Sequence, residues 1–165
     1  MESWDTFAVI VGGAAAALLG LLFVAISIRL NVVAASRALR NRSAQTMVLF
    51  AIMLMLAVLL AIPGQSRVLF GAEVVVLALL GGAGLQLLDR RAGRIQGQRG
   101  IGRVLDVIAP SAITSVLLLV AGVLLLFDRT AGLYVLVAPV IAAFAGGLTS
   151  AWLFMTRLED RPEAR

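Results

Sequence analysis

Residues 6–28 read TFAVIVGGAAAALLGLLFVAISI, a stretch without a single ionisable side chain. A helix rises about 1.5 Å per residue, so this stretch makes a helix of about 35 Å. The hydrocarbon core of a bilayer is about 30 Å thick. The stretch therefore predicts a transmembrane helix.

Four more stretches of the same kind follow, and only one of them contains an ionisable residue, Glu73. We expect an all-α, polytopic integral membrane protein, a bundle of five transmembrane helices in a single domain that covers residues 1–165. The expected helices lie at about 6–28, 43–63, 68–88, 107–127 and 131–156.

The composition excludes several classes of protein. Of the 165 residues, 61% are hydrophobic, which is more apolar surface than a water-soluble domain of this size can cover. The chain has no cysteine and no histidine, and its basic residues are all arginine. Thiol catalysis, the usual metal ligands and lysine Schiff-base chemistry are therefore ruled out, and we expect no cofactor and no metal.

The arginines predict the orientation of the chain. Twelve of them lie after the first and third predicted helices or in the C-terminal tail, and two lie in the remaining gaps. By the positive-inside rule, this bias places the N-terminus outside and the C-terminus in the cytoplasm. We expect basic cytoplasmic loops at 29–42 and 89–106. The absence of lysine, together with abundant alanine, glycine, valine and leucine, suggests a GC-rich bacterial genome, so we expect a multi-pass protein of the bacterial cytoplasmic membrane.

The second basic loop is expected to contact anionic lipid headgroups. Each basic group near such a surface contributes about 1 kcal/mol. The expected contacts are Arg90, Arg91, Arg94, Arg99 and Arg103. The net charge of +5 is explained by these flanking arginines, and nucleic acid is not an expected partner. In the first basic segment, residues 29, 33, 37 and 40 share a helical face, so the first helix is expected to continue toward Asn41.

Small residues recur at four-residue steps in three of the predicted helices. The spacing forms smooth faces that another helix can approach closely. These faces are Gly12, Ala16 and Gly20 in the first helix, Ala78 and Gly82 in the third, and Ala138, Ala142, Gly146 and Ser150 in the fifth. They predict either tight packing within one subunit or contact with a second copy or another membrane protein. Pro139 predicts a kink in the fifth helix.

Glu73 is the main candidate for a functional residue. It lies about one and a half turns into the third helix from its outer end, where a carboxylate is usually protonated, paired or facing water. Arg129 in the other outer loop is its expected partner. The two residues form either an ion or proton site near the mouth of a pathway or a structural ion pair that joins the two outer loops.

Other polar residues in the helices are expected to stabilise packing. Ser27 and Thr114 could hydrogen-bond across helices, which is worth well under 2 kcal/mol per bond in membranes. Thr149 and Ser150 are expected to bond to carbonyl groups of their own helix.

Three segments carry a resemblance to a known family. They are WDTFAVIVGGAAAALLGLLFVAISIRL at 4–30, LRNRSAQT at 39–46 and IPGQSR at 62–67. They resemble a family of small, uncharacterised actinobacterial multi-span membrane proteins without an established activity. The resemblance extends to about Arg91, and it implies membrane location and bacterial origin.

Two functions remain open at this level, and neither is enzymatic. Catalysis within a membrane needs a nucleophile with a base, a carboxylate pair or a metal cluster, and Glu73 has no acidic companion in the predicted helices. The first function is a scaffold, assembly factor or regulatory subunit. The second is a small oligomeric channel or transporter with Glu73 near its outer mouth.

Overall fold

The structure is a computed structural model that describes residues 4–28, 30–35, 37–92 and 110–159. The regular structure of these residues is helical, as predicted. The helices are α1 (Asp5–Ile28), α2 (Leu30–Ala35), α3 (Arg37–Leu60), α4 (Arg67–Ala92), α6 (Pro110–Leu126), α7 (Ala131–Val135) and α8 (Val137–Glu159).

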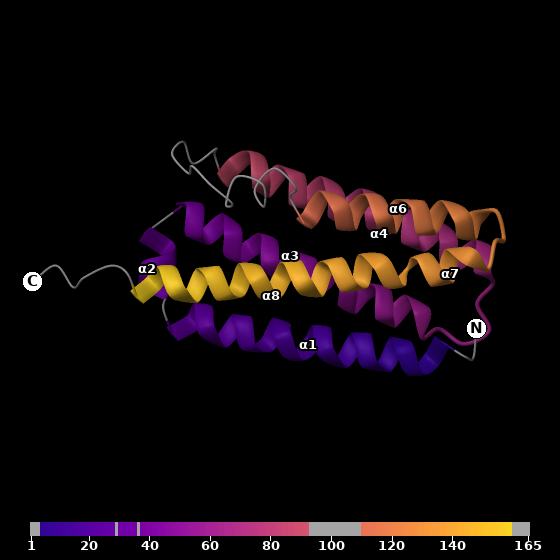
Figure 1. The fold of residues 1–165 in the computed structure, drawn as a ribbon, viewed down its shortest axis with the longest axis horizontal. Helices are drawn as coiled ribbons and strands as arrows, with labels where there is room; N and C mark the ends of the chain where they lie inside the picture. The colour runs from indigo at the N-terminus through magenta and orange to yellow at the C-terminus, as the bar shows by residue number, and fades with distance from the viewer. Residues whose placement is uncertain (1–3, 29, 36, 93–109, 160–165) are drawn as a thin grey trace, which may run out of the picture.

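The helices form an elongated bundle in which the chain passes five times along the long axis (Figure 1). The passes are α1, α3, α4, α6 and the pair α7–α8. In Figure 1, α1 begins at one end of the bundle and α8 finishes at the other. The end that holds the start of α1, residues 61–66 and residues 127–130 is called the turn end below. The opposite end, where α3 and α6 begin, is called the arginine-rich end.

Within the described residues, four helical segments are long and apolar enough to cross a membrane: Asp5–Ile28, Arg40–Leu60, Arg67–Leu88 and Ala131–Ser150. The fifth apolar segment, Ala112–Leu126, is shorter. The whole of α6 has 17 residues and a length of about 25 Å. A shortfall of a few Å costs a fraction of a kcal/mol per Å, which bilayer thinning or flanking side chains can accommodate.

The predicted helix boundaries are close to the observed ones, with one correction at the arginine-rich end. The predicted loop 29–42 is largely helical, because α2 occupies Leu30–Ala35 and α3 begins at Arg37. This sequence holds neither glycine nor proline, so nothing in it stops a helix. The predicted continuation of the first helix toward Asn41 takes the form of this separate short helix and the first turns of α3.

A continuous apolar core joins the passes. It includes Phe50 and Met53 of α3, Phe70 and Val74 of α4 and Leu125 of α6. α3 lies centrally, since it packs against α1, α4 and α8, and the contact between α4 and α6 is the most extensive in the bundle. α1 is peripheral. In the most apolar 18-residue stretch of α1, 17% of the residues are buried, compared with 50% in the corresponding stretch of α3.

The last pass is interrupted where Pro139 predicts a kink. α7 ends at Val135 and α8 begins at Val137. Pro139 lacks the N–H that would bond to the carbonyl four residues earlier, which is that of Val135. The interruption therefore begins at the residue whose carbonyl loses its helical partner.

Candidate functional site

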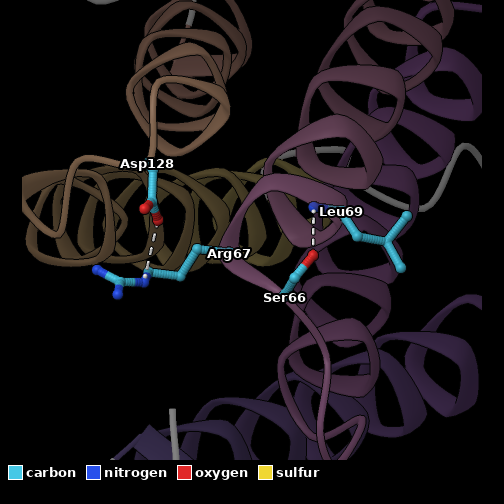
Figure 2. Close-up of polar contacts among 4 residues, drawn as sticks. All are labelled: Ser66, Arg67, Leu69 and Asp128. Carbon is cyan, nitrogen blue, oxygen red and sulfur yellow. Dashed lines mark hydrogen bonds and ion pairs between the residues drawn. The ribbon is translucent and has the colours of Figure 1, made fainter.

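Several polar residues of the turn end lie at or just before the start of α4. Residues 61–66 connect α3 to α4, and Gly64 has a φ of 70° there, in the left-handed region that favours glycine. Ser66 then caps α4, because its Oγ accepts a hydrogen bond from the Leu69 N–H at 3.2 Å (Figure 2). This cap fixes where the helix begins and hence where Arg67 and Glu73 lie.

The partner of Arg67 lies in residues 127–130, which connect α6 to α7 and are called the second turn below. α6 ends in a Schellman motif, in which the Arg129 N–H bonds to the Leu124 carbonyl and the Asp128 N–H to the Leu125 carbonyl. Asp128 takes the left-handed position with a φ of 54°. Its Oδ1 lies 3.3 Å from Nε of Arg67, so this ion pair joins the two turns (Figure 2).

Glu73 has a different partner from the expected one. Nε2 of Gln65 donates a hydrogen bond to Oε2 of Glu73 at 2.5 Å. Glu73 is half-buried, whereas Arg129 is exposed. Among the described residues no ion pair joins Glu73 to Arg129; the ion pair that connects the two turns uses Arg67 and Asp128 instead. The assignment of Glu73 and Arg129 as an ion or proton site therefore stays a prediction.

An aromatic cluster adjoins these turns. The Trp4 ring meets the rings of Phe7 and Tyr134 edge-on, with centroids 5.4 Å apart in both pairs. Phe7 lies on α1 and Tyr134 on α7. The contact therefore fixes the start of the peripheral helix α1 to the last pass of the bundle.

The predicted small-residue face of the first helix is used only in part. A Cβ on Gly12 would lie 3.2 Å from the Cβ of Ala57, so α1 approaches α3 closely at this glycine. Ala16 and Gly20 are exposed, and a Cβ on Gly20 would meet nothing within 4 Å. The buried face of α1 consists of Ala8, Val11, Ala15 and Leu22.

The last pass also presents a different face from the predicted one. Ala138 is exposed, and Ala142, Gly146 and Ser150 are half-buried. The buried positions lie one residue further along the chain, at Pro139, Ala143 and Gly147. A Cβ on Gly147 would lie 2.5 Å from the ring of Phe50, so this glycine makes room for an aromatic side chain of α3.

The close approach of α4 to α6 uses two glycines that were not among the predicted small residues. A Cβ on Gly71 of α4 would lie 2.7 Å from the backbone nitrogen of Leu126. A Cβ on Gly122 of α6 would lie 3.0 Å from the backbone nitrogen of Val75. Gly71 lies in the same row as the predicted small residues Ala78 and Gly82, so extending that row by two turns would have found it.

The arginines predicted to contact lipid lie mostly where the structure gives no description. Arg94, Arg99 and Arg103 fall outside the described residues, and so does the sequence 93–109 that holds them. Arg90 and Arg91 belong to the last turns of α4, but their side chains are not described. Their contact with anionic lipid remains a prediction.

Several polar side chains inside the described helices bond to carbonyl groups of their own helix. Thr149 donates to the Ala145 carbonyl at 2.8 Å, as predicted. Ser27 donates to the Phe23 carbonyl at 2.8 Å, so the predicted cross-helix bond is wrong for this residue. Thr114 is buried, and its hydroxyl has no partner.

The chemistry available at the turn end is acid–base and ionic. It combines a half-buried carboxylate, an amide that donates to it and an exposed ion pair. Within the described part of the chain, no group of three or more acidic, histidine or cysteine residues could hold a metal ion. Comparisons with family models, with curated proteins and with solved structures found no match to the chain.

Proposed function

We propose that this chain is a non-catalytic subunit of a bacterial cytoplasmic membrane, with its N-terminus outside, that binds another membrane-spanning helix through α1. The function is that of a scaffold, an assembly factor or a regulatory subunit. The observation that carries the proposal is the one-sided packing of α1, which contacts α3 and leaves most of its surface outside the bundle.

The glycines of α1 support this choice of face. Gly71, Gly81, Gly82, Gly122, Gly132 and Gly147 all have neighbours that a Cβ would press against. Among the described helical glycines, Gly13 and Gly20 of α1 and Gly84 of α4 have open space instead, so α1 is the helix that carries two of them. An exposed glycine within a helix costs about 1 kcal/mol relative to alanine, so its presence needs a compensating contact. A helix from another protein, approaching as closely as α6 approaches α4, would supply one.

The filled core favours a subunit over a pathway through a single copy. The centre of the bundle is occupied by apolar side chains from α1, α3, α4, α6 and α8. Among the described residues, the buried polar side chains are Ser43, Thr46 and Thr114, which lie in the N-terminal halves of α3 and α6. A solute path would need a polar or wet route along the whole bundle.

The competing function is a small oligomeric channel or transporter. The half-buried Glu73 and its bond to Gln65 are the features that favour it. In that case several copies would surround a pathway whose outer mouth carries Glu73.

Site-specific photocrosslinking in native membranes tests the proposal. A crosslinking residue replaces Leu21 on the open face of α1, and the control replaces Val116 on the exposed face of α6. We expect a discrete adduct from position 21 and none from position 116. Equal labelling from both positions, or none from position 21, would contradict the proposed contact.

Reconstituted liposomes separate the two functions. We expect proton and cation flux equal to that of empty vesicles. A flux that requires the protein and disappears in Glu73→Gln would favour the channel instead.

A further inference from the structure

One hydrogen-bonded pair at the turn end is not explained by packing. Gln65 donates from Nε2 to the half-buried carboxylate of Glu73. The other polar atom of the same amide, Oε1, is buried and has no donor. A buried acceptor that is left without a donor destabilises the folded state. The Gln65 amide thus lies where its Nε2 bonds to the Glu73 carboxylate, while its Oε1 is left without a donor.

The surroundings leave Gln65 as the group that bonds to Glu73. The elements packed against α4 are α3 and α6. Residues 47–60 of α3 contain no ionisable side chain, and neither does any part of α6. On α4 itself, Arg67 is held by Asp128 of the second turn. The other ionisable groups described at this end, Asp5, Arg129 and Tyr134, are all exposed.

An amide can match either protonation state of a carboxyl group. An ionised carboxylate only accepts hydrogen bonds, whereas a neutral carboxylic acid also donates one. Gln65 offers N–H to the carboxylate in the described arrangement. After half a turn of its amide, Oε1 accepts from the O–H of a protonated Glu73, and Nε2 takes the buried position. The pair therefore keeps a hydrogen bond in both states.

We propose that Glu73 and Gln65 form a proton-binding site at the turn end, in which the Gln65 amide turns over as Glu73 gains or loses a proton. The proton comes from water at that end, bonds to Oε2 of Glu73 and returns to water on release, and no other covalent bond changes. Gln65 directly precedes Ser66, which caps α4, and Arg67, which holds the second turn. Protonation of Glu73 is thereby coupled to residues 61–66, the segment that connects α3 to α4.

Solution NMR of the full chain in bicelles tests the site without altering it. The ¹³C signal of the Glu73 carboxyl and the side-chain amide signals of Gln65 are followed across a pH series. We expect both to change with one common midpoint. The amide of Gln86, which is exposed on α4 near the arginine-rich end, is the control and should not respond. A Gln65 amide that stays unchanged while Glu73 titrates would overturn the proposal, and so would a Glu73 carboxyl that never titrates while the helical circular dichroism persists.

Matched variants assign the response to the pair. Glu73→Gln should abolish the pH response of the Gln65 amide. Asp5→Asn, which neutralises an exposed carboxylate of the same end, should leave the response intact. Retention of the response in Glu73→Gln, or its loss in Asp5→Asn, would place the proton elsewhere. If Glu73→Gln does not fold, the titration of the unaltered chain still decides the question.

Discussion

Replacing Gly71 by alanine tests whether the approach of α4 to α6 holds the bundle together. The new Cβ would lie 2.7 Å from the backbone nitrogen of Leu126 and 2.8 Å from the Cβ of Leu125. A backbone atom cannot move aside as the tip of a side chain can, so the two helices must separate. Overpacking of this kind costs about 1–3 kcal/mol. For a chain of this size that corresponds to a fall in melting temperature of roughly 2–12 °C.

The assay is reversible unfolding in mixed micelles, followed by far-ultraviolet circular dichroism. Gly20→Ala is the matched control, because its Cβ meets nothing within 4 Å and alanine is the better helix former. We expect the control to be as stable as the unaltered chain or up to about 1 kcal/mol more stable. The reasoning is refuted if Gly71→Ala is as stable as the unaltered chain, or if both substitutions destabilise it equally.

Three further experiments test the core, the ion pair and the aromatic cluster. Phe50→Ala should lower the free energy of unfolding by about 3–5 kcal/mol, because it opens a cavity beside Gly147. Phe23→Ala on the exposed face of α1 should lower it much less in the same assay, and equal losses would contradict the assigned core. A double-mutant cycle of Arg67→Gln and Asp128→Asn should give a coupling of at most about 1 kcal/mol, since both side chains are substantially exposed; a larger value would mean that the pair is shielded from solvent. Trp4→Ala removes two edge-on ring contacts, so we expect a loss of about 1–3 kcal/mol and faster proteolysis near the start of α1, and unchanged stability and proteolysis would show that the contacts do not hold α1.

The helices could be predicted from the sequence because the bilayer imposes a simple rule. Backbone polar groups in hydrocarbon must be satisfied internally, so long apolar stretches become helices. This rule identified all five passes, and the missing N–H of Pro139 identified the interruption of the last one. The short helix α2 was harder to place, because residues 29–42 are polar enough for a loop and yet contain no residue that breaks a helix.

The packing faces could be predicted only in part, because alanine and glycine are abundant on several sides of each helix. Gly12 was correctly expected to permit close packing, whereas Gly20 faces outward. Which row of small residues is buried depends on how the helices cross, and composition does not determine the crossing. The row Gly71–Ala78–Gly82 is buried because α6 lies across it.

The partners at the turn end depend on turn geometry. Asp128 adopts a left-handed conformation at the end of α6, and this conformation places its carboxylate beside Arg67. Gln65 reaches Glu73 because residues 61–66 fold back over the first turns of α4. Both contacts join residues whose distance is set by short irregular segments, and periodicity in the helices carries no information about such segments.

Cysteine labelling of the two ends tests the five-pass topology most directly, since the chain has no cysteine of its own. Single substitutions place a thiol at Thr130, which is exposed in the second turn, or at Asn31, which is exposed on α2. A membrane-impermeant maleimide is applied to intact cells and then to permeabilised cells. We expect position 130 to react in intact cells and position 31 only after permeabilisation. Reaction of both positions from the same side would contradict an odd number of crossings with the arginine-rich end in the cytoplasm.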